Sequence, residues 1–291
     1  MKYRNHFVFK MVVLTTTVII FVSCKSKAVS ESTIDSSQIN SDGVSVVDNA
    51  DRVTITCIRD CENEMPVDLF KGSCCDTCLS RLAPNGSFKS AINVYLAMTD
   101  KYTVLFDAGL GNEKGGALLA KLAYLKVKPE KVNAIFLTHL HPDHIGGLLK
   151  DGKPVFPNAI IYLSVDEFNA WSDGGSMAAQ NGLWKQVLAS YALNIQPVND
   201  GDKLLDGIVE AHLAPGHTPG HTIYTVGDCL IVGDLLHAQD LQLSHPECCA
   251  RYDNDYEKSV KTRLKFYDFV RERNLYLCGA HCYDSKVTMT D

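Results

Sequence analysis

The feature of this sequence that most constrains its fold is a group of potential metal ligands at the end of a predicted buried strand. Residues 132–138 (VNAIFLT) are apolar and β-branched, and they lead directly into the segment HLHPDH at positions 139–144. His139 and His141 are two positions apart in extended chain, so their side chains point to the same side. Imidazole nitrogens and a carboxylate oxygen at this spacing are typical ligands of zinc or a similar divalent ion.

Asp143 and His144 follow Pro142 at a predicted helix start, where proline is tolerated because the first helical amide needs no partner. The alternative is a surface cluster of histidines that binds no metal. Four potential ligands within six residues, placed between an apolar strand and Gly146-Gly147, favour the metal site.

The chain beyond residue 50 alternates predicted strands and helices. Further strands are predicted at 52–57, 91–98, 102–107, 159–163, 222–226 and 229–233. Helices are predicted at 116–125 and at 256–271. A further helix is predicted to begin after Ser164, because Glu167 stands three positions later in the capping-box position. The last helix has an apolar stripe formed by Tyr256, Val260, Leu264, Tyr267 and Val270. Several strand pairs turn tightly, which indicates partly antiparallel sheets with helices outside.

These motifs resemble those of a known family. The pattern His-x-His-x-Asp-His followed by Gly-Gly resembles the metal-binding motif of the metallo-β-lactamase-fold hydrolases. Residues 214–222 (APGHTPGHT), 231–234 (IVGD) and 278–281 (CGAH) are similar to the remaining ligand motifs of that family, and they occur in the same order. The resemblance covers about residues 52–282. It implies an α/β fold, an αββα sandwich of two mixed β-sheets with helices on the outer faces.

The resemblance also implies a pair of divalent metal ions, with zinc as the expected metal. The implied ligands of the first ion are His139, His141 and His217, and those of the second are Asp143, His144 and His281. Asp234 and a hydroxide would bridge the two ions. Asp143 is the expected catalytic proton carrier. Asp107, in the segment LFDAG, would orient ligands from behind them.

Within the family, residues 155–159 (VFPNA), Trp171 and residues 233–237 (GDLLH) are most similar to the branch that holds lactonases and methyl-parathion-hydrolase-like enzymes. This similarity predicts hydrolysis of an ester-like bond in a small molecule, with an acyl-homoserine lactone as the leading substrate. A β-lactamase and a phosphotriesterase or aryl esterase of the same fold are the alternatives, and a bridging Asp234 argues against the β-lactamase. A metal-binding lipoprotein is the non-enzymatic alternative. Metal scavengers, however, typically carry long histidine-rich acidic tracts.

The amino terminus predicts export. The apolar run at 11–23 is preceded by three basic residues, Lys2, Arg4 and Lys10. The run is too short to cross a bilayer core of about 30 Å, but it is typical of a signal peptide. Ser23-Cys24 resembles a bacterial lipobox, so we expect residues 1–23 to be removed and Cys24 to carry a lipid anchor. A plain cleaved signal, an uncleaved anchor and an apolar helix of a cytosolic protein remain as alternatives.

Residues 24–50 are rich in Ser, Asp and Asn, which predicts a flexible tether before a single domain at 51–291. The net charge of -6 and the lack of a basic stripe argue against nucleic-acid binding. The sequence does not predict the oligomeric state.

Eleven cysteines in an exported chain predict disulfides or scattered thiols. The alternative is a structural zinc site built from Cys57, Cys61, Cys74, Cys75 and Cys78. We expect His212, His221 and His237 to pack beside the ligands rather than to bind a third metal. Phe156, Phe168 and Trp171 are expected in the core, with an apolar substrate pocket as the alternative.

Overall fold

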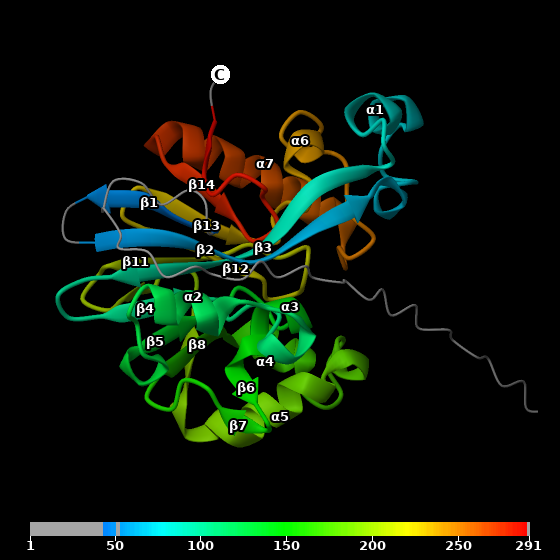
Figure 1. The fold of residues 1–291 in the computed structure, drawn as a ribbon. Helices are drawn as coiled ribbons and strands as arrows, with labels where there is room; N and C mark the ends of the chain where they lie inside the picture. The colour runs from blue at the N-terminus through cyan, green and yellow to red at the C-terminus, as the bar shows by residue number, and fades with distance from the viewer. Residues whose placement is uncertain (1–42, 51–52, 290–291) are drawn as a thin grey trace, which may run out of the picture.

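Two mixed β-sheets pack face to face in the computed structural model, which describes residues 43–50 and 53–289 (Figure 1). Within these residues the first sheet has seven strands, in the order β1 (Val44–Ala50), β2 (Val53–Pro66), β3 (Ser87–Met98), β4 (Thr103–Phe106), β5 (Ala134–Phe136), β8 (Ile160–Ser164) and β9 (Ile195–Val198). The strands from β1 to β4 are antiparallel, and those from β4 to β9 are parallel.

The second sheet has six strands in the described part of the chain. Their order is β10 (Lys203–Leu204), β11 (Val209–Leu213), β12 (Thr222–Val226), β13 (Cys229–Gly233), β14 (Tyr276–Gly279) and β15 (Val287–Thr288). Only the β13–β14 pair of this sheet is parallel. A separate small hairpin joins β6 (Leu149–Lys150) to β7 (Lys153–Pro154).

Helices cover both outer faces of this pair of sheets. The α-helices are α1 (Asp76–Leu82), α2 (Leu118–Tyr124), α3 (Pro142–Ile145), α4 (Val165–Trp171), α5 (Gly182–Tyr191), α6 (Gln239–Gln242) and α7 (Tyr256–Arg273). Short 3-10 turns occur at Val67–Leu69, Asn112–Lys114, Pro129–Lys131, Gly146–Leu148, Ala178–Gln180 and Ala192–Asn194. In Figure 1, α7 lies on one side of the sheets, and α4 and α5 lie on the other.

Three apolar layers hold this sandwich together. The middle layer packs side chains of the first sheet, such as Phe106 and Phe136, against Tyr224 of the second. One outer layer packs α2, α4 and α5 on the first sheet, and the other packs α7 on the second. The arrangement confirms the predicted αββα sandwich of two mixed sheets with helices outside.

Most predicted elements form close to their predicted positions. The hairpin predicted at 222–226 and 229–233 is the antiparallel pair β12–β13. Ser164 caps α4 as predicted, because its Oγ accepts the backbone N–H of Glu167 at 3.1 Å. Phe156 and Trp171 are buried in the core with Phe168 packed against them, which confirms their core role.

The predicted tether is wrong at its carboxyl end. Residues Val44–Ala50 form strand β1, which pairs antiparallel with β2 and so belongs to the folded domain. Val44 and Val47 are buried there, and their burial stabilises the strand although the surrounding stretch is polar. The predicted signal at 1–23, Cys24 and the tether up to residue 42 lie outside the described residues. Of the helices that the structure describes, none has the length and apolar character needed to cross a membrane.

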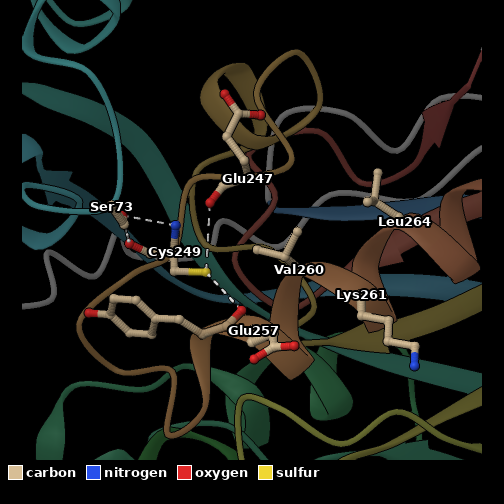
Figure 2. Close-up of a pocket in the computed structure, with 8 residues that line it drawn as sticks. Ser73, Glu247, Cys249, Glu257, Val260, Lys261 and Leu264 are labelled. Carbon is tan, nitrogen blue, oxygen red and sulfur yellow. Dashed lines mark hydrogen bonds between the residues drawn. The ribbon is translucent and has the colours of Figure 1, made fainter.

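The apolar stripe predicted on α7 is only partly buried. The Arg263 guanidinium donates hydrogen bonds to backbone carbonyls in the interior, which places Arg263 on the buried face of α7. The residues of this buried face are Ser259, Arg263, Phe266, Tyr267 and Val270. Tyr256 and Leu264 are 41% and 45% exposed. Together with Val260 they line a surface cavity of about 560 Å³ whose other side includes Ser73 and Cys249 (Figure 2).

The long strands β2 and β3 extend beyond the sandwich and carry α1 (Figure 1). A disulfide between Cys74 and Cys248 joins this extension to the segment before α7, and a second disulfide links Cys75 to Cys78 at the start of α1. Cys57, Cys229, Cys249, Cys278 and Cys282 are free buried thiols. These bonds and thiols confirm the prediction of disulfides or scattered thiols, and within the described residues they do not form the structural zinc site that was the alternative.

Candidate metal centre

The seven predicted ligands meet at one edge of the two sheets, although they come from four separate segments of the chain. His139 and His141 lie in the loop after β5, and Asp143 and His144 lie on α3. The other three follow strands of the second sheet and are His217 between β11 and β12, Asp234 directly after β13, and His281 two residues after β14. Because β13 and β14 are parallel, their carboxyl ends place Asp234 and His281 side by side.

A first cluster consists of His139, His141, His217 and Asp234, whose ligand atoms all lie within 4.8 Å of one another. Three ring nitrogens face one another. His141 Nδ1 lies 2.9 Å from both His139 Nε2 and His217 Nε2, and the latter two are 3.2 Å apart. Asp234 Oδ2 lies 3.3 Å from His217 Nε2.

His217 and His139 present lone pairs rather than hydrogens to this first cluster. His217 Nδ1 lies 3.0 Å from Asp253 Oδ1, and His139 Nδ1 lies 3.0 Å from Thr138 Oγ1, so each ring donates its proton away from the cluster. Burial lowers the pKa of His141 to about 3 and that of His139 well below its usual value, which keeps both rings neutral. Facing lone pairs cannot bond one another, and a divalent cation satisfies them.

A second cluster consists of Asp143, His144 and His281. His144 Nδ1 lies 2.7 Å from Asp107 Oδ2, and His281 Nδ1 donates to the backbone carbonyl of Ala91 at 2.9 Å. Both Nε2 atoms therefore face the cluster, and that of His281 lies 3.4 Å from Asp143 Oδ2. The donor set of one carboxylate and two imidazoles suits a second divalent cation.

Asp234 lies between the two clusters. Its Oδ1 is 3.0 Å from His144 Nε2, and its Oδ2 is 3.2 Å from His281 Nε2. His144 Nε2 and Asp234 Oδ1 are buried and contact each other at this ion-pair distance, but neither makes a well-directed hydrogen bond among the described residues. Buried polar atoms are rarely left without a partner, so this pair fits a site for cations.

The charges around Asp234 also favour cations. Burial alone would lower the pKa of His281, but Asp234 and Asp143 outweigh it and raise this pKa to about 10. Burial alone would raise the pKa of Asp234, but His281 and the other nearby histidines outweigh it and hold this pKa well below its usual value. The centre therefore carries carboxylate charge that a proton or a metal ion must balance.

Asp107 makes the supporting contacts that were predicted for it. Besides His144, its carboxylate accepts the backbone N–H of Thr138 at 2.8 Å and the Thr138 hydroxyl at 2.9 Å. Asp107 has a φ of +62°, and this turn directs its side chain under the metal loop. The same hydroxyl of Thr138 contacts His139, so Asp107 supports one ligand of each cluster.

Sequence analysis did not identify Asp253 or Arg263. Asp253 is buried against His217, and Arg263 Nη2 lies 3.5 Å from Asp253 Oδ2. Two acidic residues just before a helix, Asp253 and Asp255, resemble ordinary capping residues. Asp255 does cap α7. Nothing in the local pattern distinguishes Asp253 from a cap.

The three additional histidines have different surroundings. His221 Nε2 accepts the backbone N–H of Asp234 at 3.1 Å, whereas His212 lies on β11 and contacts the Thr225 hydroxyl. His237 is buried with its ring stacked on that of His281 at a centroid distance of 5.5 Å. Its Nε2 lies 3.3 Å from Asp234 Oδ2, and neither ring nitrogen has a hydrogen bond in the described part of the chain.

Comparison with known proteins is consistent with this geometry. The family model of the metallo-beta-lactamase superfamily matches residues 89–271. A probable metallo-hydrolase of Bacillus subtilis, YqgX, is 31% identical over 155 residues, which cover 50% of this chain and 65% of that protein. A hydroxyacylglutathione hydrolase of Yersinia pestis is 34% identical over 143 residues, which cover 48% of this chain and 45% of that protein. The chain thus spans less than two thirds of these relatives.

Solved structures match a larger part of the chain. The crystal structure of the hydrolase AbOPH in the beta-lactamase superfamily has a TM-score of 0.77 and 28% identity, and the match covers 86% of this chain and 94% of that one. The dizinc quorum-quenching lactonase AidC has a TM-score of 0.76 and 23% identity over the same shares, which shows a common fold. The matched family model, the sandwich and the clustered ligands together establish that this chain belongs to the metallo-beta-lactamase superfamily.

Proposed function

We propose that this protein is a metal-dependent hydrolase that cleaves an ester-like bond with two divalent ions, zinc being the expected metal. The position of Asp234 carries the proposal. One of its oxygens faces His144 at 3.0 Å, and the other lies 3.2 Å from His281 and 3.3 Å from His217. A carboxylate between two ligand clusters is suited to hold two ions at a fixed separation.

In this proposal each cluster holds one ion. The residues of the first site are His139, His141 and His217, those of the second are Asp143, His144 and His281, and Asp234 serves both. Divalent ions held by these residues would lower the pKa of a bound water from about 15.7 towards 7 and would so supply a nucleophile at neutral pH.

Asp143 is the proposed proton carrier because it is the accessible carboxylate of the centre. Its side chain is 28% exposed, whereas that of Asp234 is 4% exposed. An exposed carboxylate can take a proton from the attacking water and return it to the leaving oxygen. His237, which stacks on His281 and lies 3.3 Å from Asp234, is proposed to orient an oxygen of the substrate.

Lactones are the leading proposed substrates, in particular those of the acyl-homoserine type. Support comes from the resemblance of residues 155–159 and 233–237 to the lactonase and methyl-parathion-hydrolase-like branch. A lactone ring opens without losing a fragment, and its alkoxide oxygen is a leaving group that a second cation stabilises well.

Thioester hydrolysis is the second candidate. The observation that favours it is the 34% identity to hydroxyacylglutathione hydrolases, although this match covers 48% of the chain. Zinc is a borderline-soft ion that binds thiolate as well as oxygen ligands, so the leaving group does not separate the two candidates and the assays below do.

Side-by-side hydrolysis assays of the full chain, loaded with zinc, test the proposal. The substrates are an acyl-homoserine lactone, an aryl ester, a phosphotriester, a glutathione thioester and a cephalosporin, with Asp234→Asn as the inactive control. We expect the highest kcat/KM for the lactone. A clear lead of the thioester or the cephalosporin would replace the lactonase assignment, and no turnover of any substrate would reject the hydrolase.

We also propose that the protein is exported and anchored through lipid on Cys24, which lies outside the described residues. Support comes from the basic start, the apolar run at 11–23 and the pair Ser23-Cys24.

A further inference from the structure

Glu167 is a fully buried carboxylate in the first turn of α4. Within the described residues no lysine, arginine or histidine forms an ion pair with it. Its two oxygens instead accept three hydrogen bonds from two loops. The backbone N–H of Leu140 donates to Oε1 at 3.1 Å, and Oε2 accepts from the Thr218 hydroxyl at 2.7 Å and the Gly220 N–H at 3.0 Å.

The donors of these bonds adjoin the ligands of the first cluster. Leu140 lies between His139 and His141, and Thr218 directly follows His217. One carboxylate therefore spans the two loops that supply all three facing imidazoles. The second cluster is supported differently, because His144 is held by Asp107 and His281 by the carbonyl of Ala91.

The backbone of α4 is also fixed against the second of these loops. The Ser164 hydroxyl donates to the carbonyl of Gly220 at 2.7 Å. A Cβ added at Gly220 would lie 2.0 Å from the backbone nitrogen of Glu167, so only glycine permits this approach. The start of α4 thus directs the Glu167 side chain between the loops rather than back toward its own helix.

We propose that Glu167 is a positioning residue for the first metal site. Its carboxylate sets the separation between the His139–His141 loop and the His217 loop, and this separation fixes the distances among three ligand nitrogens. The inference rests on the metal centre of the proposed function but not on its substrate.

A merely structural role for Glu167 predicts a different result. If the residue only stabilised the domain, its loss would lower stability and affect both metal ions equally. A positioning role predicts selective weakening of one ion, because the three donors adjoin ligands of one cluster.

Zinc binding by the Glu167→Gln variant of the full chain tests the proposal. Glutamine keeps the size of the side chain, but its amide presents hydrogens to the donors of one loop and breaks that connection. We expect one of the two zinc ions to bind about 10–100-fold more weakly, as is typical when a group supporting a ligand is lost. The other ion should keep its affinity.

Zinc per chain by elemental analysis, chelator competition and the absorption spectrum of the cobalt-substituted protein are the readouts. Asp166→Asn is the matched control, since Asp166 is an exposed carboxylate on the same turn of α4. This control should bind both ions as the wild type does. Wild-type affinity for both ions in Glu167→Gln, or equal weakening of both, would overturn the proposal.

Thr218→Val tests the same hydrogen bond from the other side and remains informative if Glu167→Gln does not fold. We expect the same ion to be weakened, and the double variant to lose less affinity than the sum of the two single losses. Unchanged zinc binding in Thr218→Val would count against the proposal. If the wild type binds two ions but hydrolyses no lactone, the proposed substrate fails while this inference stands.

Discussion

His217 Nδ1 and Asp253 Oδ1 lie 3.0 Å apart, although the two residues are 36 positions apart in the chain. The contact turns the other nitrogen of His217 toward the first cluster. Asp253 in turn lies against Arg263, whose guanidinium donates to the backbone carbonyls of Leu235, Pro246 and Cys248. A ligand between β11 and β12 is therefore oriented by the segment that begins α7.

This contact predicts that Asp253→Asn weakens zinc binding at the first site by about 10–100-fold, because the amide no longer fixes the proton on His217 Nδ1. Chelator competition measures the change. Asp268→Asn, at an exposed position on α7, is the control and should bind zinc normally. Normal zinc affinity in Asp253→Asn would show that His217 needs no such partner.

Asp143→Asn should lower kcat by about 10²–10⁴-fold, the usual contribution of a positioned proton carrier. The assay uses the best substrate of the panel at saturating zinc, and elemental analysis confirms that both ions are present. Near wild-type turnover in the fully loaded variant would exclude Asp143 as the proton carrier.

Removal of metal with a chelator should abolish hydrolysis, and zinc or manganese should restore it. Metal should be lost more readily at pH 5 than at pH 7, because the pKa of His281 is raised to about 10 without metal, so that a proton competes with metal for this imidazole more strongly as the pH falls. The measurement is residual activity against metal content at each pH. Full activity of a metal-free sample would contradict the dinuclear mechanism.

The Cys74–Cys248 and Cys75–Cys78 disulfides should differ in their effect on stability. Cys74 and Cys248 are 174 residues apart, whereas Cys75 and Cys78 are 3 apart. Replacing the first pair with alanine should lower the free energy of unfolding by about 2–5 kcal/mol, and replacing the second pair should cost less, since a short loop restricts the unfolded chain less. Denaturant unfolding compares the two. A larger loss for the second pair would show that loop closure is not the main contribution.

Cys24→Ser should move the protein from the membrane fraction to the soluble fraction of the expressing bacterium, because lipid attachment requires the cysteine thiol. Fractionation and immunoblotting measure the distribution, and Cys229→Ser provides a cysteine control in the folded domain. Retention of Cys24→Ser in the membrane would indicate an uncleaved anchor.

The meeting of the seven candidate ligands was largely predictable because each lies in a short motif at a strand end. Spacing alone identified the cluster from His139 to His144, and resemblance to a family supplied His217, Asp234 and His281. Glu167 was recognised only as a capping residue, since a helix pattern does not show which way a side chain turns. Asp253 lacks a local signal altogether, because its partner His217 is brought near only by the packing of α7.

The limits of the domain were less predictable than its centre. The strand β1 was missed because its polar neighbours suggested a tether, while its pairing with β2 depends on an edge that local sequence does not reveal. The apolar stripe on α7 likewise led to a wrong prediction of which residues of this helix are buried. Tyr256 and Leu264 follow the apolar period but remain exposed, because the buried carbonyl partners of Arg263 set the rotation of the helix.

The metal centre draws its ligands from both sheets of the sandwich, with His139 after β5 of the first and Asp234 after β13 of the second. An unfolded chain keeps only the local group from His139 to His144 together, so we expect metal to bind the folded protein more tightly than the unfolded chain. The folding equilibrium is consequently linked to free metal, and each tenfold rise in its concentration above the dissociation constant adds about 1.4 kcal/mol per site. We therefore expect the melting temperature of this protein to rise with the supply of metal.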